Sequence, residues 1–346
     1  MNSGSRKICT LLVGLLLAVP RTRAADPATA EQSGDVWAAI EENDRFAFKN
    51  LDRHYTQGLK FIWLSAEDRL PQTVDRLLNI VPAVGLDPQA NRLGATIGQN
   101  IYTPKNLTLS HPDPTDRPYA GWFYAGLVLQ RQGTSFGDVP ILENLELDLG
   151  IVGPQSLADS AQANFHRLSG GTKPIAWAQQ LQTEPGLLLR YGRFCRLTPC
   201  PAATNWFDLV PYGGGVLGNV EIAGTLGVNA RLGWNLPPDF GPQTIDGLGT
   251  LSGGVDPNSA PWLFYVFGGT EGRAVAHNLF LDGNSFQHSP SVDREPWVAD
   301  LRFGLTTRLW HHFEFGYIHT LRTREFRGQR GNDQFGSLVA KAEWNW

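Results

Sequence analysis

Apolar and polar residues alternate with a period of two along several segments of the chain. In residues 335–346 the two faces of this pattern are Leu338, Ala340, Ala342, Trp344 and Trp346 on one side, and Ser337, Lys341, Glu343 and Asn345 on the other. Residues 297–309 and 142–151 alternate in the same way. Because successive side chains of a β-strand point to opposite faces, the pattern predicts strands with one apolar and one polar face.

Strand-like patterning covers most of the chain. The segments are 35–48, 55–66, 92–102, 119–131, 141–152, 185–195, 206–217, 219–234, 262–271, 273–282, 296–309, 312–322 and 335–346. A closed barrel whose chain begins and ends on one side needs an even number of strands. One of these assignments is therefore wrong, and we expect twelve strands, with 206–234 the least certain region. Long loops are expected near 67–91, 103–118, 153–184, 235–261 and 283–295.

Two kinds of all-β fold fit this pattern, a transmembrane antiparallel β-barrel and a secreted β-sandwich. The barrel is favoured because aromatic residues lie at strand ends and the last strand is itself aromatic. Strands of about 9 to 11 residues with a lipid-facing and a lumen-facing side are typical of outer-membrane barrels. Closure also leaves no unpaired strand edge in the hydrocarbon region. We therefore expect an outer-membrane barrel of twelve strands, with a short helix in an extracellular loop.

The N-terminal residues resemble a secretory signal peptide. Two basic residues, Arg6 and Lys7, precede a short apolar run and small residues before Ala24, so residues 1–24 would be removed and 25–346 would form one domain. No later segment has 18 consecutive apolar residues, as a membrane-spanning helix requires.

The net charge and the cysteines add little about function. A net charge of −4 gives no case for nucleic-acid binding. In an oxidising compartment Cys195 and Cys200 are expected to form a disulfide.

A short polar stretch, DSAQANFHRLSG at 159–170, has helix-compatible composition inside the long loop 153–184. The i, i+4 spacing would place Gln162 and His166 side by side on such a helix. A lone histidine is more often an ordinary loop side chain, as expected for the seven others: His54, His111, His277, His288, His311, His312 and His319. A histidine beside an amide can also orient and deprotonate water.

Two further polar clusters lie near predicted strand ends. If a hairpin turn is centred near Asn50, Asp44 faces Thr56 across the strand pair, while Asn43 points to the other face unless a bulge turns it. These side chains could equally be ordinary polar residues near a turn. Lys105 and Arg117 flank a Pro-rich loop and are expected at the outer rim, either solvated or bound to lipopolysaccharide phosphates.

Together these stretches resemble the outer-membrane lipid A 3′-O-deacylase family over essentially the whole mature chain. The resemblance is carried by ENDRF, DRHYTQG, YTP, DRPYAG and GPQSLADSAQANFHR. It implies a twelve-stranded barrel with its active site between the outer wall and a helix from an extracellular loop. It also implies hydrolysis of the ester at the 3′ position of lipid A, with release of the acyloxyacyl group, and a dependence on Ca²⁺.

Carried over residue by residue, the family's catalytic positions fall on His166, Gln162, Asn43, Asp44 and Thr56. His166 would take a proton from water, with Asp44 or Gln162 holding the imidazole or the water. A bound Ca²⁺ would polarise the ester carbonyl, and Asn43 and Asp44 offer the oxygen ligands that calcium prefers. The segment 170–186 after the helix aligns less securely, so no site residue is carried over from it.

Two other functions fit an outer-membrane barrel. An outer-membrane phospholipase uses a His–Ser pair, but His277 and Ser285 do not have the spacing of those enzymes. A channel or an adhesin needs no catalytic residues, and the pattern does not say whether the lumen is filled or open. The expected partners of a deacylase are lipid A in the outer leaflet and the outer membrane, and we expect a monomer.

Overall fold

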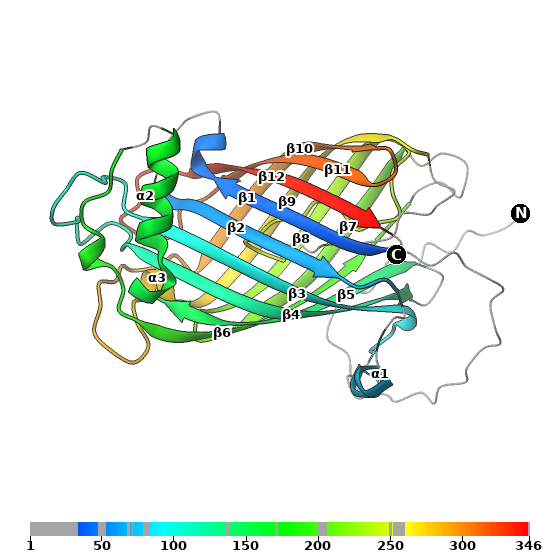
Figure 1. The fold of residues 1–346 in the computed structure, drawn as a ribbon, viewed down its shortest axis with the longest axis horizontal. Helices are drawn as coiled ribbons and strands as arrows, with labels where there is room; N and C mark the ends of the chain where they lie inside the picture. Colours follow the sequence, from blue (N-terminus) through cyan, green and yellow to red (C-terminus); the bar gives the residue numbers. More distant parts are fainter. Residues whose placement is uncertain are drawn as a thin grey trace, which may run out of the picture.

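Twelve antiparallel strands close into a barrel, with β1 paired to β12 (Figure 1). The computed structural model describes residues 34–47, 53–67, 70, 72–78, 83–135, 139–169, 172–198, 206–248, 251 and 260–344. The strands are β1 (Asp35–Asn43), β2 (His54–Leu64), β3 (Asp87–Thr103), β4 (Ala120–Thr134), β5 (Pro140–Val152), β6 (Glu184–Cys195), β7 (Phe207–Gly218), β8 (Glu221–Trp234), β9 (Leu263–Asn278), β10 (Trp297–Leu309), β11 (Phe313–Arg322) and β12 (Asp333–Trp344). The predicted all-β barrel of twelve strands is confirmed.

The surplus strand of the sequence prediction is in β9. The segments 262–271 and 273–282 were predicted as two strands, but they form one strand that ends at Asn278 and is followed by helix α3 (Leu279–Asp282). Small residues, Gly268, Gly269 and Gly272, interrupt the apolar pattern inside this strand and mimic a turn. The region 206–234, which seemed least certain, contains two strands as predicted.

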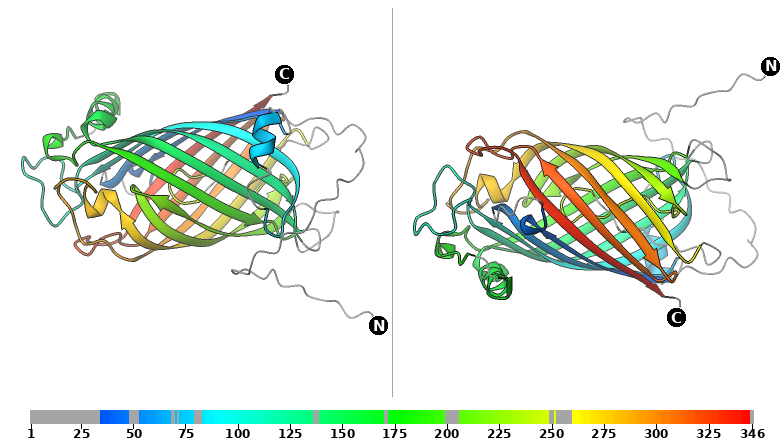
Figure 2. Two further views of the ribbon diagram at one scale, coloured as in Figure 1. Left: turned by 90° about the horizontal axis from the view of Figure 1, so that it is seen from below. Right: turned by 90° about the horizontal axis from the view of Figure 1, so that it is seen from above.

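β1 begins and β12 ends at one end of the barrel, called here the terminal end; the opposite end, which carries α2 (Ala158–Ser169) and α3, is the loop end (Figure 1). α1 (Gln72–Leu78) lies at the terminal end. Three short 3₁₀ helices, η1 (Asp44–Phe46), η2 (Pro154–Ser156) and η3 (Trp177–Gln179), lie between strands at the loop end. Figure 2 shows α2 outside the wall in both views.

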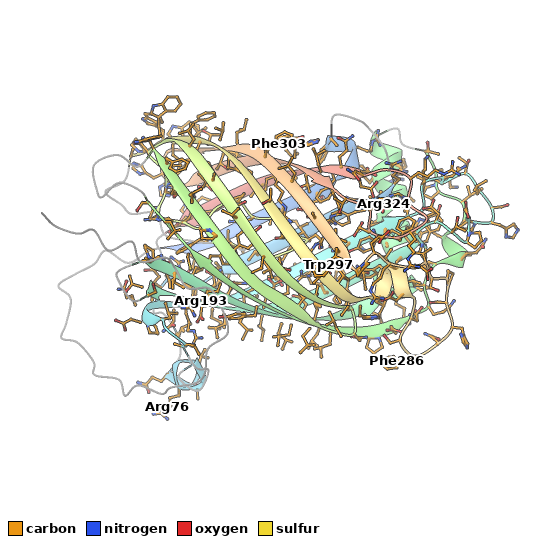
Figure 3. All side chains as sticks on the ribbon, turned by 180° about the vertical axis from the view of Figure 1, so that it is seen from behind. Arg76, Arg193, Phe286, Trp297, Phe303 and Arg324 are labelled. Carbon is orange, nitrogen blue, oxygen red and sulfur yellow. The ribbon has the colours of Figure 1, made fainter. Side chains whose placement is uncertain are left out.

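Outward-facing positions form a band of exposed apolar side chains. Trp37 on β1, Leu127 on β4 and Leu226 on β8 are 51%, 63% and 61% exposed. On β10, Trp297 and Phe303 belong to the same face (Figure 3). An apolar band of this extent is stable only against lipid. Among the described residues, no helix has the length and apolar character needed to cross a bilayer.

Ion pairs fill the lumen. Arg231 binds Asp208 on the neighbouring strand at 2.6 Å, and Arg302 binds Glu271 at 3.0 Å. Arg322 reaches Asp300 at 2.8 Å. Charged side chains avoid the cost of burial only when they are paired in this way.

The predicted loop 235–261 does not remain outside the barrel. Its described residues 236–248, called here the inner segment, fold back from the terminal end into the lumen. Asp239 pairs with Arg231, and Asp246 reaches Arg322 at 2.5 Å. The backbone N–H of Ile245 donates to Glu42 of β1 at 3.0 Å. The inner segment therefore occupies the barrel along much of its length.

The loop end of the lumen is covered by α3. Leu279, Phe280 and Leu281 are buried, and the Phe280 ring stacks on Tyr102 of β3 with 4.3 Å between centroids. This apolar cap and the inner segment thus both occupy the lumen.

Several predictions concern residues outside the described ranges. The signal peptide at 1–24, the turn near Asn50, Cys200 and the last residue, Trp346, all lie there. Cys195 is buried at the terminal end of β6. The expected disulfide and the leader peptide stay predictions.

Candidate functional site

After β5 the chain turns back onto the outside of the wall. Gly153 has a positive φ of 85°, which glycine adopts without strain, and its N–H donates to the Gly121 carbonyl of β4 at 3.0 Å. On the outer face of β3, Gln99 donates to the Ser156 carbonyl at 2.6 Å. The predicted helix then runs as α2 across β4 and β3 (Figure 1).

Gly121 is the point of closest approach between helix and wall. A Cβ at this position would lie 2.1 Å from Ser156 Oγ and 2.3 Å from Ala158 Cβ. Only glycine therefore allows η2 and the first turn of α2 to rest on β4.

We expect Gly121→Val to lift the start of α2 from the wall and to lower, at least tenfold, the lipid hydrolysis that the family resemblance implies, because a displacement of about 1 Å can cost about a hundredfold in rate. The measurement is turnover of lipid substrate by barrels whose folding is verified by their heat-dependent migration in gels. Gly272→Val is the matched control, because Gly272 faces outward on β9 with open space around its Cβ position. Equal losses in both variants would contradict this account of Gly121.

An apolar cluster holds the loop segments against the outer wall. Its buried members are Ile101, Leu107, Tyr119, Ala158, Ala176 and Trp177. The Tyr119 and Trp177 rings lie 4.9 Å apart. Sequence reasoning missed Trp177, because its segment aligns poorly and a single tryptophan has no periodic pattern.

The side chains of Gln162 and His166 both lie on the buried side of α2, which faces the barrel wall. Gln162 is fully buried, and its Oε1 accepts a hydrogen bond of 2.9 Å from Trp177 Nε1. This contact fixes the orientation of the amide, so that Nε2, which makes no hydrogen bond to the described residues, is the donor left for another group.

His166 is 4% exposed, and its Nδ1 lies 2.6 Å from the Thr172 carbonyl oxygen. A carbonyl only accepts, so Nδ1 carries the proton and Nε2 is the basic nitrogen of the neutral ring. The backbone of the chain after α2 therefore selects the tautomer. Thr172 has no side-chain signal that sequence analysis could have used.

Thr56 reaches the outer face through a bulge. The β2–β3 register shifts between Tyr55 and Gln57. Tyr55 points into the lumen, where it donates to Glu42 at 2.9 Å. Thr56 Oγ1 instead meets Thr103 Oγ1 at 2.7 Å. The bulge thus brings two hydroxyls together on the outer face of the wall.

Asn43 and Asp44 lie at the end of β1. The predicted hairpin register is confirmed, since Asn43 pairs with Gln57, but Asp44 has left the strand for η1 and does not pair with Thr56. Asn43 Oδ1 caps η1 by accepting from Arg45 N at 2.9 Å. Asp44, 2% exposed, accepts from the backbone N–H of Arg53.

η1 itself is fastened to the outside of the neighbouring strands. A Cβ at Gly336 of β12 would lie 2.7 Å from Phe46 Cβ, so Phe46 rests directly on this glycine. Tyr317 of β11 donates to the Phe46 carbonyl at 2.9 Å. The five predicted catalytic residues are therefore carried by β1, η1, β2 and α2, and η1 and α2 lie at the loop end (Figure 1).

The two predicted substrate-binding cations differ in exposure. Lys105 is exposed, but the rim position expected for Arg117 is wrong. Arg117 is 1% exposed, binds Glu325 at 2.8 Å and lies 4.4 Å from the centre of the Tyr102 ring. The carboxylate and the ring draw the guanidinium toward the barrel interior, where it stabilises the loop end.

His54 was expected to be an ordinary loop or interfacial side chain. It is instead buried and bridges two carboxylates, an arrangement called here the His54 clamp. Its Nδ1 lies 2.6 Å from Asp333 of β12 and its Nε2 lies 3.2 Å from Asp116. Burial acts to raise the pKa of Asp116, but hydrogen bonds from His54 and from Lys105 N outweigh it and hold that pKa below the ordinary value. The clamp ties the loop before β4 to the strands that carry η1.

The residues present fit calcium only in part. Calcium prefers oxygen ligands, and the buried carboxylate of Asp44 is suitable. The oxygen of Asn43 is already engaged with Arg45 N. Within the described ranges no group of three or more His, Cys, Asp or Glu side chains could hold a metal. A calcium ion would therefore need Asp44 together with backbone carbonyls and water.

A closed twelve-stranded barrel with an apolar outer band and a polar interior is the architecture of a bacterial outer-membrane protein. The family model of the outer membrane protein LpxR matches residues 11–344, and the chain belongs to this family.

A solved structure of an LpxR protein has the same fold. LpxR from Salmonella typhimurium is 20% identical, with 89% of this chain and 100% of that chain covered and a TM-score of 0.70. The β-domain of the Bordetella autotransporter BrkA is 10% identical, with 91% and 100% covered and a TM-score of 0.43. No curated protein sequence matches the chain.

Proposed function

We propose that this chain is a lipid A deacylase, which hydrolyses the ester at the 3′ position of lipid A in lipopolysaccharide and releases the 3′-acyloxyacyl group. The observation that supports it is His166, a buried histidine with a selected tautomer on a helix outside the wall. An enzyme that acts on a lipid of the outer leaflet must direct its reactive groups toward the membrane, not toward the lumen.

The chemistry follows from the residues in place. His166 Nε2 takes a proton from water, and the resulting hydroxide attacks the ester carbonyl, while the Thr172 carbonyl stabilises the imidazolium through Nδ1–H. Gln162 Nε2 is positioned to donate to the attacking water or the carbonyl oxygen. Thr56 and Thr103 supply hydroxyls on the wall below. Protonated His166 then returns the proton to the departing sugar oxygen.

Calcium, held by Asp44 with backbone carbonyls, would supply Lewis-acid polarisation of the ester carbonyl when bound. Such stabilisation of the oxyanion is typically worth a few kcal/mol.

The test is incubation of the refolded full chain with purified lipid A, with and without EGTA, followed by mass spectrometry. Loss of a mass equal to the 3′-acyloxyacyl group is expected, and EGTA should suppress it. Fatty-acid release from glycerophospholipid with lipid A left intact would instead identify a phospholipase. Unchanged masses of both lipids would reject an esterase altogether.

The phospholipase alternative has little support around His277 and Ser285. The His277 ring bonds to the Asn219 carbonyl at 2.9 Å and to Asp282 at 3.0 Å. Both ring nitrogens are therefore occupied by other partners, and His277 is not available to activate a serine.

Trp177→Phe is expected to lower kcat about fivefold with little change in KM, because it removes the indole N–H that orients Gln162, a hydrogen bond worth about 1 kcal/mol. Gln162→Glu keeps the acceptor oxygen but replaces the Nε2 donor. Adding Trp177→Phe to Gln162→Glu should therefore cost little more. The measurement is a double-mutant cycle on kcat.

Trp63→Phe is the matched control for this cycle, because Trp63 also donates its indole N–H to a side chain, Asp35 at 3.3 Å, but near the terminal end. Fully additive losses from Trp177→Phe and Gln162→Glu would show that Trp177 contributes packing alone.

A further inference from the structure

Glu41 places a carboxylate on the membrane-facing side of the wall. Along β1 the buried positions Val36, Ala38, Ile40 and Glu42 face the lumen, and the alternate positions face outward. Glu41 is therefore outward and two residues from Asn43, which continues the same row. Below it on this face lie Ala39 and Trp37, both apolar. A carboxylate above such residues needs an explanation, because ionisable side chains facing lipid are costly and usually functional.

The immediate partners of Glu41 are side chains of the site. Gln57, directly opposite Asn43 in the β1–β2 ladder, donates its Nε2 to Glu41 Oε1 at 2.8 Å. The Asn43 side chain interacts with the same carboxylate. Asn43 is 1% exposed and its Nδ2 makes no hydrogen bond of normal geometry. Glu41, Gln57 and Asn43 thus form one polar group, called here the Glu41 subsite.

The Glu41 subsite can be placed relative to the ester that would be cleaved. Two residues along a strand span roughly 7 Å, so Glu41 lies about that far from Asn43 toward the membrane interior. This is where the first few atoms of an acyl chain would pass if its ester lay near η1. Glu41 is only partly buried, so a lipid group can reach its carboxylate.

We propose that the Glu41 subsite accepts a hydrogen bond from a hydroxyl or amide N–H close to the ester, and so selects among acylated sugars. A carboxyl oxygen of Glu41 already accepts from Gln57, and its remaining lone pairs can accept a second hydrogen bond. A 3-hydroxyacyl chain offers a hydroxyl, and an N-acylated sugar offers an amide N–H. A plain hydrocarbon chain offers neither, and a hydroxyl that carries a secondary acyl chain has lost its donor. The inference rests on the proposed deacylase function and adds a preference within it.

Defined glucosamine 3-O-esters test the proposal on the full chain in detergent micelles. The probes carry a 3-hydroxyacyl chain, the same chain without the hydroxyl, or the hydroxyl chain with an N-methylated amide. Glu41→Leu should raise KM about tenfold for a probe whose donor reaches the subsite, as expected for the loss of one partly buried hydrogen bond, with kcat within twofold. Glu41→Gln, which keeps an acceptor, should restore part of the loss.

The three probes separate the two donor sources. Loss of the distinction between the first two probes in Glu41→Leu assigns the hydroxyl, and loss of the distinction between the first and third assigns the amide. An equal change for all probes, or none, overturns the subsite. Thr270→Val, an exposed outward position on β9, is the control for removing a polar group from the lipid face.

The proposed function is tested separately within the same experiment. Turnover of any of the three esters by the unmodified chain requires catalysis, whichever donor the subsite prefers. If no ester is cleaved, the deacylase proposal fails, and binding of ether analogues of the three probes still measures the preference. Equal affinities of the unmodified chain for all three analogues would then contradict the subsite.

Discussion

His166→Ala should abolish ester hydrolysis, with a loss of about a hundredfold to ten-thousandfold in kcat, the usual contribution of a positioned general base. The variant removes the ring whose Nδ1 is held by the Thr172 carbonyl. The barrel should fold unchanged, because His166 lies on α2 outside the wall. The measurement is initial rate of acyl release from lipid A by quantified, gel-verified barrels.

His111→Ala is the matched control, since His111 is exposed in the loop between β3 and β4, and it should retain full activity. If the His166→Ala variant kept more than a tenth of the activity, His166 would not be the general base. Another residue of the barrel wall would then have to act as the base.

Removal of the inner segment should convert a closed barrel into a conducting one. The unmodified chain is expected to show no steady conductance in planar bilayers, because the inner segment and the α3 cap fill the lumen. Deleting residues 239–248 takes away two carboxylates, Asp239 and Asp246, and no basic residue. The lumen left behind is richer in arginine, so the new conductance should favour anions.

A second variant replaces Asp239 and Asp246 by asparagine, and so removes the two carboxylates without shortening the chain. Breaking buried ion pairs from one side typically costs 3 to 5 kcal/mol, so this variant should lose heat stability as well as open intermittently. Asp293→Asn is its control, because that carboxylate is 81% exposed. Steady conductance of the unmodified chain would contradict the closed lumen and revive the channel interpretation.

The fold was largely accessible from the sequence because a barrel wall has a strict two-residue period. The same logic predicted the β1–β2 register and the span of α2, both set by local pattern. It failed where contacts join residues distant in sequence. Asp246 meets Arg322 inside the barrel, and nothing in either local sequence distinguishes a loop that enters the lumen from one that remains outside.

The candidate site was accessible only as separate fragments. His166 and Gln162 share a helix face, which spacing reveals, whereas their orienting partners do not follow from spacing. Thr172 acts through its backbone, and Trp177 begins the single-turn helix η3, which has no periodic pattern of its own. For Arg117 the sequence prediction was wrong. Its charge alone suggested an exposed side chain, but its buried partner, Glu325, lies on another loop and could not be foreseen.

Because α2 lies on the outer face, the relevant substrate concentration for this protein is a density within the membrane. A lipid that reaches His166 by moving sideways within the leaflet never enters bulk water or the lumen. Encounter is then a two-dimensional process, governed by the number of lipid molecules per unit area of membrane. Dilution of the whole suspension should leave the rate per barrel unchanged, whereas dilution of lipid A with inert lipid in the same bilayer should reduce it.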